Sequence, residues 1–73
     1  MSYEVNLNLI KETRRQRGIS MDQMADKLKL ANRSVYSKRE NGLAKFKPEE
    51  LPALCSILEL SLNAIFLPKM STK

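Results

Sequence analysis

The stretch GISMDQMADKLKLANRSVYSKRENG, residues 18–42, decides the fold of this chain. Ser20 and Gln23 have the S-x-x-Q spacing of a capping box, in which each side chain accepts a hydrogen bond from the backbone of the other residue. We therefore predict a helix over residues 21–29. Its apolar side chains fall on one stripe, which we expect to face a core and which comprises Met24, Ala25 and Leu28.

A second helix follows within the same stretch, over residues 33–41. Asn32 is a favourable N-cap for it, and Gly42 can end it because glycine readily adopts the left-handed conformation that follows a helix. Leu30 and Ala31 are left to form a tight turn between the two helices. The stretch therefore predicts two short helices joined by a turn.

The outer face of this second helix carries side chains that are short and polar or long and cationic. They share one side because positions three and four apart are neighbours on a helix, and they are Arg33, Ser34, Ser37 and Lys38. Arginine pairs bidentately with guanine, and serine can donate or accept a hydrogen bond, so the set suits base edges and phosphates. An ordinary solvated helix face would explain the charges, but not their shared spacing beside a tight turn.

A supporting helix is predicted before this stretch, over residues 7–17, and residues 1–5 are predicted to be a loose leader. Asn6 can cap the helix. Arg14 lies on the same face as the apolar Ile10. Because a charge on a core-facing side needs a partner, we expect a carboxylate from later in the chain to meet Arg14.

Two further helices are predicted after the stretch. One begins at Pro48 and ends at Leu60, and its core-facing stripe comprises Leu51, Leu54, Cys55 and Leu58. A short helix over residues 62–67 carries more apolar side chains than one buried face needs. Some of them are expected to complete the core and the remainder to form a self-association surface, the candidates being Leu62, Ile65, Phe66 and Leu67.

The chain has 73 residues, which suits one domain near the lower size limit of a self-sufficient core. We predict a single all-α domain with its core over residues 7–67 and short flexible ends. The lone Cys55 can form no intramolecular disulfide, which favours a reducing, cytoplasmic compartment. There is no histidine and no apolar run long enough to span a membrane. No catalytic residue, metal site or cofactor is predicted, and an enzyme is the least favoured class of protein.

Basic residues are concentrated in one part of the chain. Residues 11–47 hold eleven Lys/Arg and four Asp/Glu, whereas residues 48–67 hold three glutamates and no Lys or Arg. The direct interpretation is that a polyanion such as nucleic acid docks on the basic part. The alternative is a solvated basic surface that maintains solubility.

Several short pieces of the chain, taken in order, resemble the phage repressor and Cro-type (Xre-like) helix-turn-helix family. They span about residues 7–67 and are Ile10-Lys11-Glu12-Thr13-Arg14, Gly18-Ile19-Ser20, Met24-Ala25-Asp26-Lys27-Leu28, Tyr36-Ser37-Lys38, Glu40-Asn41-Gly42 and Leu51-x-x-Leu54-Cys55-x-x-Leu58. The resemblance implies a compact bundle of five helices, in which the second and third form the helix-turn-helix.

The resemblance also implies roles for individual residues. The helix over 33–41 would be the recognition helix in the DNA major groove, with the base-reading candidates Arg33, Ser34, Ser37 and Lys38. Phosphate contacts would come from Ser20, Asn32, Asn41, Lys45 and Lys47. Arg14 and Glu40 match a pair that forms a salt bridge in relatives, which would supply the carboxylate expected for Arg14.

Three positions depart from the family pattern. The turn is one residue longer than usual, and we place the extra residue at Ala31. The residues assigned to the recognition helix could therefore be shifted by one position relative to the family pattern. Arg39 stands where relatives usually have an apolar residue. Met21 stands where they often have a glutamine that contacts phosphate.

Two functions of different classes follow from these observations. The first is a sequence-specific DNA-binding transcriptional regulator of the repressor or Cro type, bacterial or from a phage, that binds double-stranded operator DNA as a homodimer. The second is a protein-binding modulator, antirepressor or antitoxin-like module that acts through a partner repressor. The apolar helix over residues 62–67 and the irregular turn motivate this alternative.

Overall fold

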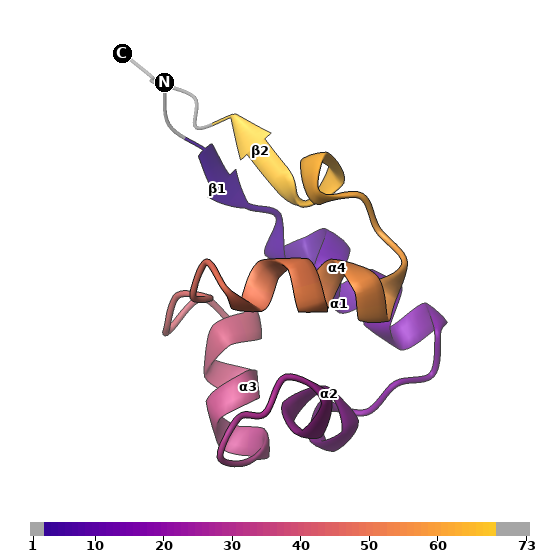
Figure 1. The fold of residues 1–73 in the computed structure, drawn as a ribbon, viewed down its shortest axis with the longest axis vertical. Helices are drawn as coiled ribbons and strands as arrows, with labels where there is room; N and C mark the ends of the chain where they lie inside the picture. The colour runs from indigo at the N-terminus through magenta and orange to yellow at the C-terminus, as the bar shows by residue number, and fades with distance from the viewer. Residues whose placement is uncertain (1–2, 69–73) are drawn as a thin grey trace.

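The computed structural model describes residues 3–68 of the chain. In chain order (Figure 1) the elements are β1 (Tyr3–Val5), α1 (Leu7–Gln16), α2 (Met21–Lys27), α3 (Arg33–Glu40), α4 (Glu50–Leu58), the 3-10 helix η1 (Leu62–Ile65) and β2 (Phe66–Pro68). The domain is all-α in class, and its four α-helices surround a small core. Of the predicted flexible ends, residues 1–2 and 69–73 lie outside the described residues.

Three of the helices begin at the caps that the sequence indicates. The side-chain oxygens of Asn6, Ser20 and Asn32 each accept a backbone N–H three residues further on, all at 3.1 Å. These bonds satisfy donors that a helix leaves without partners in its first turn. Local side-chain chemistry therefore sets where α1, α2 and α3 start.

The fourth helix begins later than predicted, at Glu50 and not at Pro48. Residues 48 and 49 form a turn, and the Glu50 carboxylate accepts the backbone N–H of Lys47 at 2.9 Å. Pro52 is the third residue of the helix. Its missing N–H is one that the first turn leaves free in any case, so the helix continues through it.

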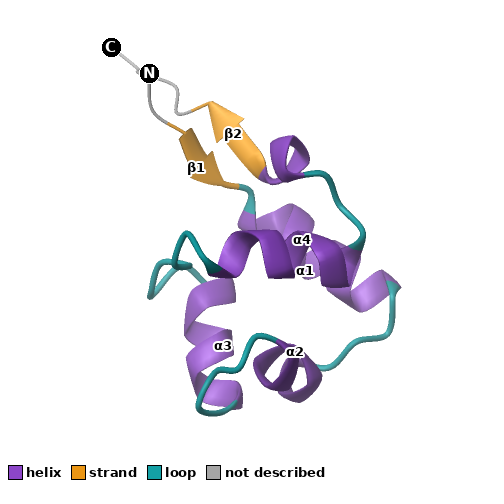
Figure 2. Cartoon of the chain, in the orientation of Figure 1, coloured by secondary structure: helices purple, strands orange, loops and turns teal. Residues whose placement is uncertain are grey.

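The predicted fifth helix over residues 62–67 is wrong in its last two residues. Only η1 is helical, and the chain then extends as β2, which pairs with β1 in a two-stranded antiparallel sheet (Figure 2). Within the described residues, the bundle therefore has four α-helices and a 3-10 helix, not the five helices predicted. Residues 3–5, predicted as part of a loose leader, form β1, in which Val5 lies opposite Phe66 of β2. The backbone N–H of Asn6 also donates to the carbonyl of Ile65 at 2.6 Å. Backbone hydrogen bonding thus joins the two ends of the described chain.

The core draws at least one fully buried side chain from every helix. Among the described hydrophobic residues, those with no exposed surface are Ile10, Met24, Tyr36, Leu54, Leu58 and Ile65. Met24 and Ala25 pack inward as predicted, and the ring of Phe46 meets that of Tyr36 edge to face with centroids 6.2 Å apart. The buried Cys55 belongs to the same core, where burial raises the pKa of its thiol.

Arg39 is buried, although a charge there departs from the usual apolar residue. Its side chain lies between α3 and α4, with Nη1 3.2 Å from Oε1 of Glu50 and donating to the carbonyl of Lys45 at 2.9 Å. The Nε atom has no hydrogen-bond partner among the described residues. A buried ion pair therefore occupies a contact that apolar side chains could fill.

Within residues 3–68, no helix is both long and apolar enough to cross a membrane.

Candidate nucleic-acid interface

The turn between α2 and α3 is built around a left-handed residue. Lys29 has φ +59°, and the next residue, Leu30, donates its backbone N–H to the carbonyl of Ala25 at 2.8 Å. Leu30 packs against the core, whereas Ala31 is exposed. Asn32 then caps α3, so the helix starts at Arg33, where the sequence predicts it.

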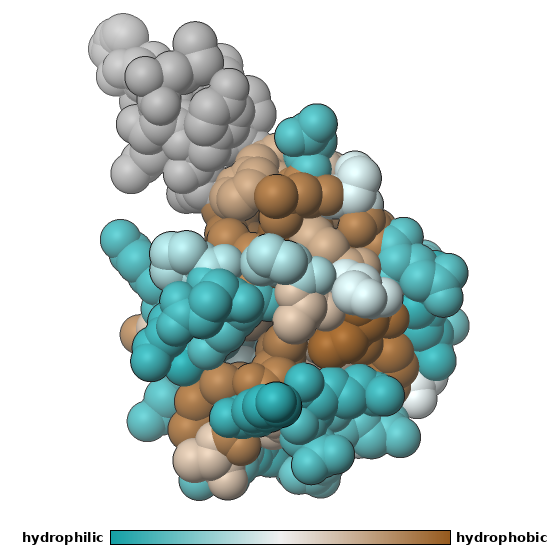
Figure 3. All heavy atoms as spheres, viewed as in Figure 1, coloured by the Kyte–Doolittle hydropathy of each residue, from teal (hydrophilic) through white to brown (hydrophobic). Residues whose placement is uncertain are grey.

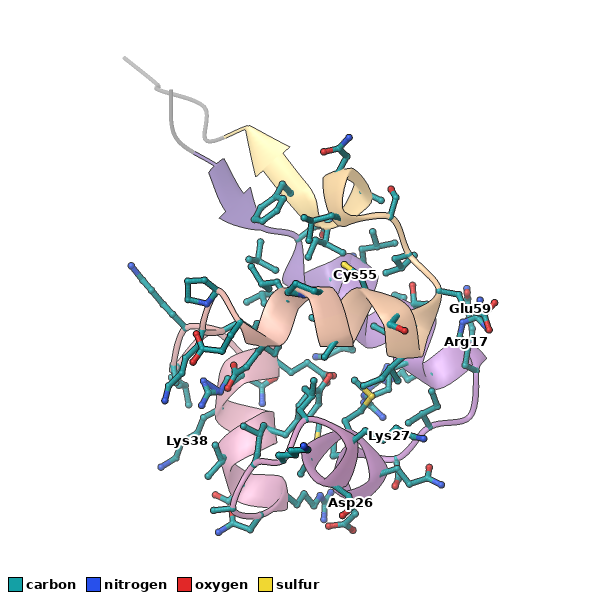
Figure 4. The ribbon with its side chains drawn as sticks, viewed as in Figure 1. Arg17, Asp26, Lys27, Lys38, Cys55 and Glu59 are labelled. Atoms are coloured by element: carbon teal, nitrogen blue, oxygen red, sulfur yellow. The ribbon has the colours of Figure 1, made fainter. Side chains whose placement is uncertain are left out.

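The outer face of α3 presents the predicted base-reading residues unequally. Arg33, Ser34 and Lys38 are exposed, and Figure 4 shows Lys38 pointing away from the body of the molecule. Ser37 is half-buried, and its hydroxyl oxygen accepts a hydrogen bond from the side-chain amide of Asn41 at 3.2 Å. Of the four predicted base-reading residues, Arg33, Ser34 and Lys38 are therefore the most exposed.

The residues predicted to contact phosphate differ in whether their side chains already make hydrogen bonds within the protein. Lys45 and Lys47 are exposed in the loop after α3. Two backbone N–H groups of that loop, those of Leu43 and Ala44, donate to the carbonyl of Lys38 and hold the loop to the end of α3. Their distances are 2.8 and 3.1 Å. The lysine side chains thus extend from a loop whose backbone is fixed next to the end of α3.

Ser20 and Asn32 already serve as caps. The backbone N–H of Ser20 donates to the side chain of Gln23 at 2.8 Å, and its hydroxyl oxygen accepts the Gln23 N–H. The side-chain oxygen of Asn32 accepts from Val35. Any phosphate contact from these two residues would therefore use the hydroxyl proton of Ser20 and the amide protons of Asn32, which the caps leave unused.

The predicted pair of Arg14 and Glu40 is present and fixes α3 to α1. Nε of Arg14 lies 2.8 Å from Oε2 of Glu40, Nη2 lies 3.2 Å from Oε1, and Nη1 donates to the carbonyl of Ile19. Their hydrogen bond raises the pKa of the Arg14 guanidinium. This bidentate contact is buried and is the geometry in which arginine and carboxylate bind most strongly.

The sequence reasoning did not identify the third member of this cluster, Tyr36. Its hydroxyl donates to Oε2 of Glu40 at 2.7 Å. Burial, together with this hydrogen bond, raises the pKa of the Tyr36 hydroxyl far above its ordinary value. The spacing of Tyr36 and Glu40, one helical turn apart, is the signal that could have revealed the contact.

Most of the described residues predicted to form a self-association surface are buried or half-buried in the structure. Ile65 has no exposed surface because it faces the core, so its assignment to this surface is wrong. Phe66 is half-buried, Leu62 is 46% exposed, and the side chain of Leu67 lies outside the description. Figure 3 shows apolar side chains at the end of the molecule where η1 and β2 lie. Among the described side chains, Leu62 is the main apolar group left accessible there.

Comparison with known families supports the geometry. A family model described as a helix-turn-helix domain matches residues 8–69, which include α2, α3, α4 and all of α1 except its first residue. No curated protein and no solved structure matched the chain. The match agrees with the resemblance to repressor and Cro-type proteins, and it covers most of the sequence. The chain therefore belongs to the family of helix-turn-helix domains.

Proposed function

We propose that this protein is a sequence-specific DNA-binding transcriptional regulator of the repressor or Cro type, with α3 as the helix that enters the major groove. The observation that carries the proposal is the contrast between the two sides of α3. One side is anchored by the buried contacts of Glu40, and the other side exposes Arg33, Ser34 and Lys38. A rigid helix with a free polar face is what reading base edges requires.

Phosphate contacts supply most of the affinity in this proposal. The exposed Lys45 and Lys47 follow α3 in the chain, with Asn41, Ser20 and Asn32 as further phosphate contacts. If roughly four to six cations of each subunit engage phosphate, binding weakens steeply as salt rises. The protein then binds a two-fold operator as a homodimer, with one recognition helix in each half-site and the half-sites about one helical turn apart.

A direct test compares an operator-containing duplex from the region upstream of the gene with a scrambled duplex of the same composition. The wild type is expected to prefer the operator, and Arg33→Ala is expected to reduce that preference by about tenfold. The matched control is Arg17→Ala, which removes the same charge. Figure 4 places Arg17 on the side of the molecule away from Lys38. Equal binding of the two duplexes by the wild type would reject the proposal.

A second function rests on two exposed apolar side chains. Leu43 is 79% exposed and Leu62 is 46% exposed. In this alternative the chain is a modulator, antirepressor or antitoxin-like module that binds a partner repressor through such groups. Two results together would support this alternative. The wild type would bind no DNA duplex, and it would co-purify with one stoichiometric protein partner that the Leu62→Ser variant no longer binds.

A further inference from the structure

A shallow hollow of ≈ 510 Å³ lies on the face that carries the predicted reading residues. Four of its lining residues come from the cap and exposed side of α3, and the fifth comes from the first turn of α2. They are Asn32, Arg33, Ser34, Ser37 and Asp22. Asp22 is the one acidic group of the set, and the sequence reasoning gave it no role.

The carboxylate of Asp22 is free to meet a ligand. Asp22 is exposed, and none of the ion pairs among the described residues involves it, although Arg33 lines the same hollow. A carboxylate in this position repels DNA phosphates and so opposes the general affinity that the basic residues provide. An acid that opposes general affinity can still favour one base edge over another.

We propose, on the basis of the DNA-binding function above, that Asp22 is a specificity-determining residue that accepts a hydrogen bond from the N4 amino group of a cytosine. An ionised carboxylate only accepts hydrogen bonds, and the cytosine amino group presents a donor in the major groove. Adenine also presents a donor, but its N7 acceptor lies beside it and repels a carboxylate.

Arg33 complements this contact within the hollow. Its guanidinium donates to the O6 and N7 acceptors of guanine, whereas Asp22 accepts from cytosine. The two opposite charges therefore select a half-site that holds a guanine and a cytosine at neighbouring positions. Asp22 accordingly lowers binding to duplexes of any other sequence while it permits binding to this one.

The experiment selects duplexes from a randomised library with the wild type, Asp22→Ala and Asp26→Ala. Asp26 is the matched control, because it is exposed on the same helix one turn further on and does not line the hollow. The wild type is expected to enrich a cytosine beside a guanine. Asp22→Ala is expected to lose the cytosine preference by about tenfold and to bind random duplex more tightly, whereas Asp26→Ala keeps the preference.

Two results would overturn the inference while leaving the DNA-binding function intact. One is a cytosine preference that survives in Asp22→Ala, and the other is an equal loss in Asp26→Ala. A wild type that enriches no sequence would instead reject both the DNA-reading function and the role of Asp22. Thermal melting of each variant shows that the compared proteins are folded.

Discussion

Glu40 anchors α3 to α1 through buried contacts. Its carboxylate accepts hydrogen bonds from Arg14 of α1 and from Tyr36 of its own helix, and its side chain has no exposed surface. A buried carboxylate is stable only when such partners replace the water it has lost. Removing a single partner therefore costs more than the removed contact contributes by itself.

The substitution Tyr36→Phe tests this cluster with little change of shape. It keeps the ring that packs on Phe46 and removes the hydroxyl that donates to Glu40. We expect the free energy of unfolding at neutral pH to fall by about 1–3 kcal/mol, because the carboxylate loses a buried donor. Urea denaturation measures the change. A variant as stable as the wild type would mean that Arg14 alone satisfies Glu40.

The same residue gives a prediction at alkaline pH. The pKa of Tyr36 is raised above its ordinary value of 10.0, and that of Cys55 is raised above 9.0, both chiefly by burial. Each group therefore holds its proton more tightly in the folded protein than in the unfolded chain. These two groups do not alter the stability well below pH 9, and they lower it as the pH rises past 9 and 10, where the unfolded chain loses these protons.

Denaturation at a series of pH values measures this loss. Tyr36→Phe removes one of the two groups, so its stability is expected to decline less steeply above pH 10 than that of the wild type. The comparison uses the slope and not the absolute stability, which the lost hydrogen bond also lowers. Parallel slopes for the two proteins would contradict the assignment of the alkaline loss to Tyr36.

At the scale of elements, the contact between α3 and α4 depends on a charged pair. Arg39 and Glu50 are each less than a tenth exposed, and Nε of Arg39 has no partner among the described residues. Arg39→Met alone leaves Glu50 buried with only the Lys47 N–H, so we expect a loss of about 3 kcal/mol. Arg39→Met combined with Glu50→Gln removes both charges and keeps an acceptor for that N–H.

Urea denaturation of the two single variants and the double variant measures the coupling. The double variant is expected to recover most of the stability that Arg39→Met loses, because no buried charge is left without its partner. Losses that simply add would show that the two side chains stabilise the contact independently.

The elements also differ in how well the sequence predicts them. The starts of α1, α2 and α3 follow from Asn6, Ser20 and Asn32, because a cap is a local interaction among residues close in sequence. The strands β1 and β2 have three residues each, too few for an alternating pattern, and they exist through their pairing with each other. The burial of Ile65 likewise depends on contacts distant in the sequence, because η1 packs against α1 and α4.

The candidate site shows the same division. The exposed face with Arg33 and Lys38 follows from helical spacing alone. The shared hollow with Asp22 depends on how α2 crosses α3, which no pattern within one helix contains. Arg39 became interpretable only when the structure supplied Glu50 as its partner.

At the scale of the whole molecule, the uneven charge predicts how binding responds to salt. If about four to six cations of each subunit engage phosphate, the slope of log K against log salt is expected to be about −4 to −5 for each subunit. Lys45→Ala removes one contact and reduces the size of this slope by about one, without changing the preferred sequence. Fluorescence anisotropy at several salt concentrations measures it. Arg17→Ala is the control, because Arg17 pairs with Glu59 on another part of the surface.

The pairing of β1 with β2 has a consequence for how the protein is made. Tyr3 lies opposite Pro68, 65 positions further along the chain. A ribosome adds roughly 5–20 residues each second and releases the earlier ones first. During translation β1 is therefore synthesised several seconds before its partner strand exists. Of the two strands of this sheet, β1 is made first, but it can pair only after β2 has been made.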